Sequence, residues 1–136
     1  MIETHENFKW QESGLITNPR YPFMGASPDG IMLCDCCSTV LVEIKCPYCY
    51  RDSNIDEIID CLELKNGEFT LKTSHAYFYQ IQCQLLLSNV EYCDFLVWTQ
   101  TDFSVKEFHL MKFLCWYGSE CRTVLHSFLN MWFCQN

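Results

Sequence analysis

Apolar and β-branched residues gather along the chain in short runs that predict β-strands. Residues 39–45, with the sequence TVLVEIK, are rich in β-branched side chains and end two positions before Pro47, as strands often do. Residues 92–99 and 105–110 carry similar runs. We therefore expect these three segments to be strands.

Three other segments space their apolar positions in the way that is typical of amphipathic helices. They are residues 55–64, 75–89 and 121–133. Before the second segment, Ser74 stands at a position suited to an N-cap. Within it, Gln80 and Gln84 share one helical face, because residues four apart are neighbours on a helix.

Turn-forming residues separate these elements. The tetrapeptide at 27–30, SPDG, predicts a tight hairpin turn, because proline presets one turn position and Asp-Gly tolerates positive φ. Asn66-Gly67 predicts a second turn that leads into residues 68–72, whereas residues 1–20 show no clear pattern. Residues 21–33, with apolar side chains on both sides of the first turn, supply the first β region. The resulting order, roughly β-β-α-α-β-β-α, predicts an α/β (α+β) fold with residues 1–136 as a single domain.

Composition narrows the class of protein. The chain has 136 residues, 49% of them hydrophobic and 19% charged, a balance that excludes intrinsic disorder and suits one domain. A formal charge of −8 disfavours a surface that coats DNA nonspecifically. No apolar run reaches the roughly 20 residues of a membrane span, and the acidic first residues lack a secretory h-region. We therefore expect neither a membrane protein nor a secreted one.

Eleven cysteines need a separate explanation. Their odd number and the missing secretory signal argue against a disulfide scaffold, so we expect mainly free thiols in a reducing, intracellular environment, with nucleus or cytoplasm left open. Structural zinc is the alternative, because four thiolates can bind zinc tetrahedrally. The cysteines with ligand-like spacing are Cys34, Cys36, Cys37, Cys46 and Cys49. The last two also form a C-x-x-C pair, for which redox catalysis is a weaker alternative.

One group of residues suggests catalysis. Glu43 and Lys45 project from the same face of the strand predicted at 39–45, since strand side chains alternate. With Asp29 nearby, two carboxylates could hold Mg²⁺, which keeps waters and leaves room for a phosphate, while the lysine orients a water molecule or stabilises developing charge. This pattern would suit phosphodiester hydrolysis. The competing interpretation is an ordinary turn aspartate and a solvated Glu–Lys pair.

Four segments, in order along the chain, closely resemble the YqaJ-like viral recombinase family, which includes the lambda-type exonucleases of the PD-(D/E)XK nuclease superfamily. The segments are GASPDG at 25–30, VEIKCPY at 42–48, YFYQIQ at 77–82 and CDFLVWT at 93–99. The resemblance implies a restriction-endonuclease-like fold, a mixed central sheet flanked by helices. It also implies a Mg²⁺-dependent DNA exonuclease that acts on double-stranded ends in recombination.

The resemblance also implies roles for individual residues. Asp29, Glu43 and the Ile44 backbone carbonyl would bind Mg²⁺, with Mn²⁺ as a substitute. Lys45 would be the catalytic lysine, and Gln80 would support the lysine and the scissile phosphate. The residues expected to shape the site are Ser27 and Tyr77.

The family carries a further carboxylate on an upstream helix, and that position aligns before Met1. We therefore expect a chain truncated at its N-terminus. The alternatives are a catalytically impaired relative that binds DNA or a protein partner, and a zinc-stapled interaction module. The expected partners are double-stranded DNA ends and a single-strand annealing protein, and an oligomer is compatible with the family.

Overall fold

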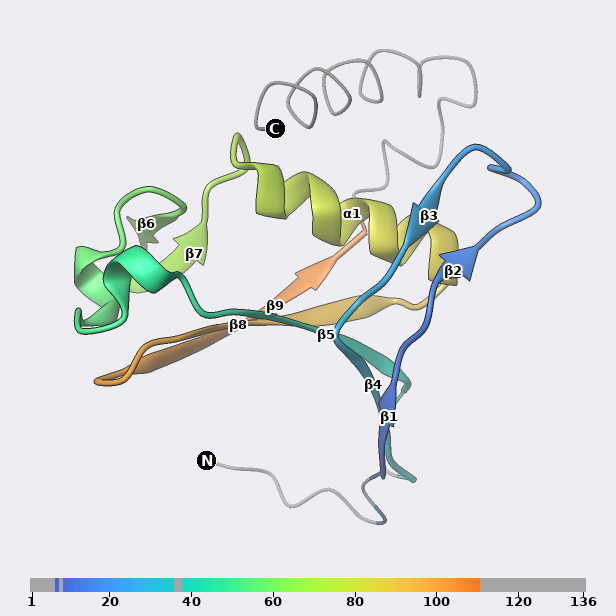
Figure 1. Ribbon diagram of the computed structural model, residues 1–136, viewed down its shortest axis with the longest axis horizontal. Coiled ribbons are helices and arrows are strands. Elements are labelled where there is room, and N and C mark those ends of the chain that lie inside the picture. Colours follow the sequence, from blue (N-terminus) through green and yellow to red (C-terminus); the bar gives the residue numbers. More distant parts are fainter. Residues whose placement is uncertain (1–6, 8, 36–37, 111–136) are drawn as a thin grey trace.

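The computed structural model describes residues 7, 9–35 and 38–110. A five-stranded sheet forms its centre, and a single long helix, α1, crosses one face of that sheet (Figure 1). The strands of the sheet, in spatial order, are β1 (Lys9–Glu12), β4 (Gly30–Leu33), β5 (Val40–Lys45), β8 (Tyr92–Trp98) and β9 (Phe103–His109). The helix α1 spans Ala76–Ser88. The predicted mixed central sheet in an α+β fold is therefore confirmed.

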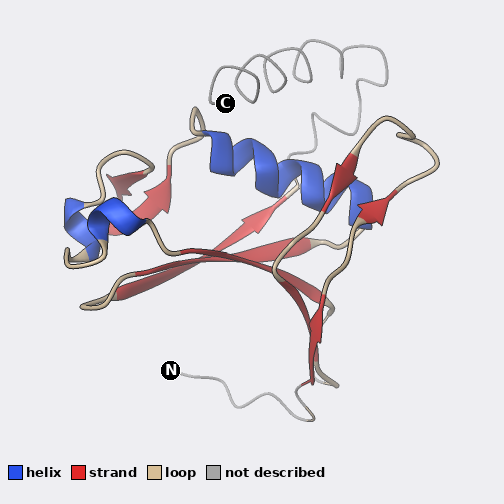
Figure 2. Cartoon of the chain, viewed as in Figure 1, coloured by secondary structure: helices blue, strands red, loops and turns tan. Residues whose placement is uncertain are grey.

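Smaller elements surround this centre (Figure 2). Two hairpins pair β2 (Ile16–Thr17) with β3 (Gly25–Ala26), and β6 (Leu62–Lys65) with β7 (Glu68–Leu71). Two 3₁₀ turns, Tyr48–Tyr50 and Ile55–Glu57, lie between β5 and β6. None of the helices in the described part of the chain has the length and apolar character needed to cross a membrane.

The sheet is mixed because β5 and β8 run parallel, while the other neighbouring pairs are antiparallel. A parallel pair needs a crossover, and here the crossover contains both the β6–β7 hairpin and α1. The crossover lays α1 over the central strands. Buried between helix and sheet are the side chains of Leu41, Cys93, Phe95, Val97, Phe78, Ile81 and Leu85.

The opposite face of the sheet carries large apolar side chains that remain exposed. They are Trp10, Ile44, Trp98, Phe103 and Val105, between 37% and 65% exposed. Strand parity explains their common orientation, because Trp98 pairs with Phe103 and residues directly opposite each other share a face. Among the described elements, only α1 lies across the sheet, on the other face (Figure 1).

Gly30 is required by a close approach on that exposed face. A Cβ atom added to Gly30 would lie 2.2 Å from the Trp10 ring. The tight hairpin turn predicted at residues 27–30 is wrong. Neither Asp29 nor Gly30 has a positive φ, and residues 27–30 form no hairpin turn. The segment instead connects β3 and β4, which pair with different partners, β2 and β1.

The β6–β7 hairpin corrects a second prediction. Residues 55–64 were expected to be helical, but only Ile55–Glu57 form a short 3₁₀ turn, and Leu62–Lys65 form β6. The cause is the turn that follows, where Asn66 and Gly67 have φ of 53° and 82°, the geometry that favours a tight hairpin. The hairpin then buries Leu62 and Leu71 in the core.

The remaining predictions have mixed outcomes. The strands expected at 39–45, 92–99 and 105–110 and the helix expected at 75–89 are confirmed as β5, β8, β9 and α1, and the residues that follow the predicted turn at Asn66-Gly67 contain β7. His75, not Ser74, is the N-cap of α1. The unpatterned region 1–20 contains β1 and β2, and the helix predicted at 121–133 lies outside the described residues.

Candidate active site

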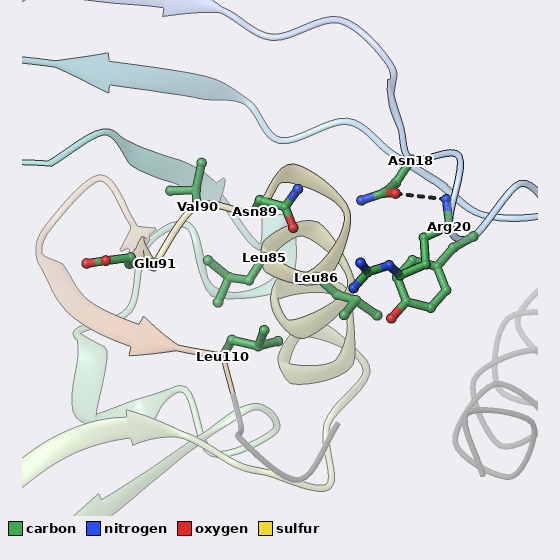
Figure 3. Close-up of a pocket in the computed structure, with 9 residues that line it drawn as sticks. Asn18, Arg20, Leu85, Leu86, Asn89, Val90, Glu91 and Leu110 are labelled. Carbon is green, nitrogen blue, oxygen red and sulfur yellow. Dashed lines mark hydrogen bonds between the residues drawn. The ribbon is translucent and has the colours of Figure 1, made fainter. Parts of the chain in front are cut away.

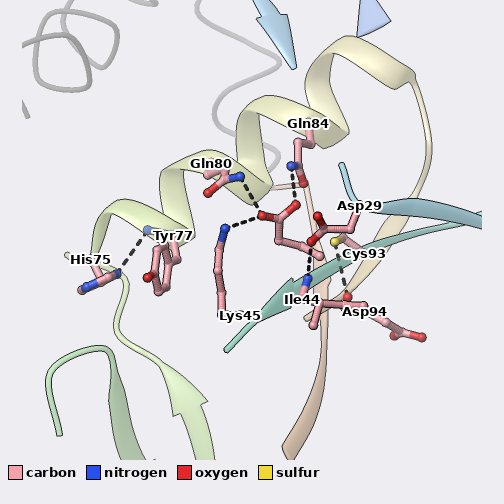
Figure 4. Close-up of polar contacts among 10 residues, drawn as sticks. Asp29, Ile44, Lys45, His75, Tyr77, Gln80, Gln84, Cys93 and Asp94 are labelled. Atoms are coloured by element: carbon pink, nitrogen blue, oxygen red, sulfur yellow. Dashed lines mark hydrogen bonds and ion pairs between the residues drawn. The ribbon is translucent and has the colours of Figure 1, made fainter. Parts of the chain in front are cut away.

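Glu43 is the centre of a polar cluster between β5 and α1, because Lys45, Gln80 and Gln84 all contact its carboxylate; the three side chains converge in Figure 4. Its side chain faces the helix and only 2% of its surface is exposed. Two amides one helical turn apart reach it: Gln80 Nε2 donates to Oε1 at 2.7 Å, and Gln84 Nε2 donates to Oε2 at 2.7 Å. A buried carboxylate requires such donors, because burial without partners is costly.

Asp29 lies beside Glu43 because of the pairing of β4 with β5. Gly30 pairs with Val42 in an antiparallel register, so the preceding residue, Asp29, continues the ladder next to Glu43. Asp29 Oδ2 accepts a hydrogen bond of 2.6 Å from the Ile44 backbone amide. The expectation that Asp29 and Glu43 share one face of the sheet agrees with this register.

Cys93 is a buried thiol close to these carboxylates. It is fully buried on β8, and burial, together with the nearby charges of Glu43, Asp94 and Asp29, raises the pKa of its thiol to about 12. A neutral thiol therefore lies beneath the carboxylates. The thiol cannot act as a nucleophile near neutral pH, because the thiolate is the reactive form.

Lys45 completes the cluster. Its ammonium forms an ion pair with Glu43 Oε1, at 2.5 Å, and lies 4.8 Å from the centre of the Tyr77 ring. The side chain is 20% exposed, so the charge lies at the border between the core and solvent. This aromatic contact restricts the lysine to the side of the cluster nearest the N-terminus of α1 (Figure 4).

The N-terminus of α1 is held by His75. Its Nδ1 accepts a hydrogen bond from the Tyr77 backbone amide at 3.2 Å, and the two rings meet edge to face at 4.5 Å. Burial lowers the pKa of His75 below its ordinary value of 6.5, so the imidazole is neutral near pH 7 and its Nδ1 can accept the bond. His75, for which the sequence suggested no role, thus positions the Tyr77 ring beside Lys45.

The arrangement can suit a hard divalent cation. Mg²⁺ takes oxygen ligands, commonly one or two carboxylates with the remaining positions filled by water. Asp29 is exposed, and within the described part of the chain Glu43 Oε2 accepts a bond only from Gln84. Each carboxylate therefore keeps acceptor capacity. Among residues 7, 9–35 and 38–110, no group of three or more His, Cys, Asp or Glu side chains could hold a metal ion. The site therefore suits a cation that takes two carboxylates from the protein and fills its other positions with water.

The residues expected at the site fall into two groups. The structure brings together Asp29, Glu43, Lys45, Gln80 and Tyr77. Ser27 is exposed two positions before Asp29, and Ile44 meets Asp29 through its amide nitrogen. The roles of Ser27 and of the Ile44 carbonyl stay predictions.

Gln84 was missed as a site residue, although its position on the face of Gln80 had been recognised. Spacing alone could have suggested it, because a residue four positions after Gln80 faces the same strand. What the sequence could not show is the depth of Gln84, which is 1% exposed.

The cysteines predicted as zinc ligands do not gather within the described part of the chain. Cys46 and Cys49 are exposed free thiols, as expected, and Cys61 and Cys93 are buried free thiols. Cys34 differs from that expectation, since it is disulfide-bonded. Cys36 and Cys37 lie outside the described residues.

A cavity of about 400 Å³ opens at the other end of α1 (Figure 3). Asn18 and Arg20 line it on one side, with Leu86 and Leu110 among the apolar residues. Asn18 donates a hydrogen bond to the Leu87 carbonyl at 3.2 Å, which ties the β2–β3 connection to the helix. The cavity shares no lining residue with the cluster around Glu43.

Comparison with known families gives one match that covers most of the chain. The model of the YqaJ-like viral recombinase domain matches residues 3–91. This range includes Asp29, Glu43, Lys45 and Gln80. A search of curated proteins finds no match.

Solved structures give similar proteins. The crystal structure of an alkaline exonuclease (LHK-Exo) from Laribacter hongkongensis is 26% identical, with a TM-score of 0.59, over 94% of this chain and 59% of that one. LHK-Exo in complex with dAMP is 24% identical, with a TM-score of 0.59, over 94% of this chain and 58% of that one. The chain thus spans less than two-thirds of the length of the exonuclease it resembles.

Proposed function

Because the chain belongs to the YqaJ-like viral recombinase domain family, we propose that it is a metal-dependent DNA exonuclease that hydrolyses phosphodiester bonds at double-stranded ends. The observation that carries this proposal is the convergence of Asp29, Glu43 and Lys45 at one end of β5. Two carboxylates next to the paired residues Gly30 and Val42, one of them in an ion pair with a lysine, are groups that suit metal-assisted phosphodiester hydrolysis. The similarity to an alkaline exonuclease supports the same reaction class.

Asp29 and Glu43 are the residues that would hold Mg²⁺ or Mn²⁺, with the Ile44 carbonyl as a proposed further ligand. The ion would supply Lewis-acid stabilisation of the phosphate charge and lower the pKa of a bound water. The protein itself supplies the geometry. Asp29 is fixed by the Ile44 amide, and Glu43 by the two glutamines of α1.

Lys45 is the group that would act beside the nucleophile. Its ammonium donates hydrogen bonds and carries a full charge, so it can orient a water molecule or stabilise the charge that develops on the phosphate. The Tyr77 ring, 4.8 Å from Nζ, limits where that charge can move. Gln80 donates to the same Glu43 oxygen as Lys45 and so helps to keep the carboxylate in position for the ion pair with the lysine.

Double-stranded DNA ends are the proposed substrate, with a single-strand annealing protein as a proposed partner. The relative from Laribacter hongkongensis is an alkaline exonuclease and was crystallised with dAMP, which supports a nucleotide-binding site in this type of fold. The chain carries 17 acidic and 9 basic residues. Binding is therefore proposed to be confined to the site, without a broad basic surface.

A non-catalytic DNA- or protein-binding domain is the second candidate. It is favoured by one observation: within the described ranges, the cluster holds two carboxylates rather than three or more metal-binding side chains. Fewer ligands give less positional control, and loss of positioning can cost about a hundredfold in rate.

The experiment that tests the proposed function follows release of labelled nucleotides from linear duplex DNA, with covalently closed circular DNA as the control substrate. An exonuclease with Mg²⁺ or Mn²⁺ releases label from the linear duplex only, and EDTA abolishes the release. Equal attack on the closed circle would contradict the exonuclease assignment. Release that persists in EDTA would contradict the dependence on metal.

A further inference from the structure

Gln84 carries an unusual combination of contacts. Its side chain is 1% exposed, and its Nε2 donates to Glu43 Oε2 at 2.7 Å. Its Oε1 is buried and has no hydrogen-bond partner. In the described part of the chain it is the only buried side-chain nitrogen or oxygen atom in that state. Such an atom destabilises the fold, because its hydration is lost without replacement.

The charge of Glu43 explains why the unpaired oxygen persists. If the amide were reversed, Gln84 Oε1 would face Glu43 Oε2, and two acceptors would be in contact. Lys45 and Gln80 already donate to the other oxygen of Glu43, as expected for an ionised carboxylate. Gln84 must therefore direct its nitrogen to Glu43 and leave its own oxygen without a partner. An apolar residue would avoid this cost but would lose the donated bond.

The donors are distributed unequally over the two carboxylate oxygens. Among the described residues, Oε1 accepts from Lys45 and from Gln80, whereas Oε2 accepts from Gln84 alone. Each carboxylate oxygen offers about two acceptor positions. Oε2 is thus the oxygen with a position left for another ligand, and the Gln84 bond determines in which direction that position points.

We propose that Gln84 is a positioning residue for the metal site: it fixes the rotation of the Glu43 carboxylate and so aims the remaining acceptor position of Oε2 at a divalent cation. This inference rests on the proposed function, because it assumes that Glu43 binds a cation. Residues that orient a metal ligand in this way typically contribute 10- to 100-fold to metal affinity or activity.

The chain offers a matched control on the same helix. Gln82 is 2% exposed, and its Nε2 donates to the His109 backbone carbonyl at 3.0 Å. It is therefore a buried glutamine of α1 that donates away from the carboxylates. Replacement of either glutamine by methionine keeps the length of the side chain and removes the amide.

The experiment measures the dissociation constant for Mn²⁺ by calorimetry, and the midpoint of thermal unfolding, for wild type, Gln84→Met and Gln82→Met. We expect Gln84→Met to weaken Mn²⁺ binding about 10-fold or more while it still unfolds cooperatively. Gln82→Met should bind Mn²⁺ like the wild type. If Gln84→Met does not unfold cooperatively, Gln84→Asn takes its place in both measurements, because its amide is one methylene too short to reach Glu43. The same loss of Mn²⁺ affinity is then expected of Gln84→Asn.

The outcomes separate this inference from the proposed function. Unchanged Mn²⁺ affinity in the folded Gln84 variant, with binding by the wild type, overturns the role of Gln84 alone. An equal loss of affinity in Gln82→Met also overturns it, since the effect would then be a general loss of helix packing. A wild-type chain that binds no Mn²⁺ overturns the proposed metal site, and the inference with it.

Discussion

Glu43 shows how a single residue determines the chemistry of its surroundings. It is a charged group with 2% exposure, which the fold tolerates because three side chains donate to it. Removal of one partner from a buried, paired charge is costly, because the charge left behind is uncompensated. Asp29 beside it is exposed to solvent, so the site has one buried and one accessible carboxylate.

Thiol reactivity gives a prediction at the scale of residues. Burial raises the pKa of Cys61 and of Cys93, to about 12 for Cys93, while Cys46 and Cys49 are exposed. We expect iodoacetamide at pH 8 to modify Cys46 and Cys49 in the native protein and to leave Cys93 unmodified, because only the thiolate reacts. Peptide mapping by mass spectrometry measures this. Modification of Cys93 at the rate of Cys46 would contradict the buried position beneath the carboxylates.

At the scale of elements, the N-terminus of α1 depends on a titratable cap. The folded chain lowers the pKa of His75, mainly through burial. The fold therefore favours the neutral imidazole, whose Nδ1 accepts from the Tyr77 amide. The stabilisation is fully present above the ordinary pKa of about 6.5 and is lost as the pH falls through that value toward the lower folded-state pKa.

The variant His75→Asn tests this cap, because asparagine is a good N-cap that does not titrate in this range. We expect the wild type to lose more thermal stability than His75→Asn when the pH is lowered from 7.5 to 5.5. Melting curves at both pH values measure the difference. Equal losses in the two proteins would show that His75 does not contribute to the pH dependence.

The elements also show what the sequence can and cannot predict. β5 and α1 were predictable, because a run of β-branched residues and an apolar helical spacing are local signals. The segment 55–64 was predicted wrongly because its end is drawn into a hairpin by Asn66 and Gly67, and pairing with β7 outweighs local helical preference. Gln84 was missed since its role depends on Glu43, which lies 41 positions away.

At the scale of the whole molecule, the two faces of the sheet differ. One face packs against α1 and contains the core and the carboxylates, and the other exposes large apolar side chains. The candidate site thus lies where the covered face reaches solvent, at the end of β5. Asp29, Lys45 and Gln80 come from the β3–β4 connection, from β5 and from α1, so the site forms only when the sheet and helix are assembled.

Two phenylalanines test this asymmetry. Phe95 is 2% exposed on the covered face, whereas Phe103 is 65% exposed on the other. We expect Phe95→Ala to lower the free energy of unfolding by about 3–5 kcal/mol, as large-to-small core substitutions do, and Phe103→Ala to change it by about 0.5 kcal/mol or less. Urea denaturation measures both. Similar losses for the two variants would mean that the exposed face is packed in solution.

Lys45 permits the most direct test of the proposed site, because the chain contains a second Glu-x-Lys pair as a control. On β6, Lys65 pairs with Glu63 at 2.7 Å with the same two-residue spacing, but more exposed to solvent. The measurement is the rate of label release from end-labelled linear duplex at saturating Mn²⁺, for wild type, Lys45→Ala and Lys65→Ala, each shown to be folded. We predict that Lys45→Ala lowers the rate about 100-fold or more and that Lys65→Ala leaves it within about twofold of the wild type, since exposed ion pairs contribute little. Release that survives in Lys45→Ala at the wild-type rate would contradict the assignment of the active site.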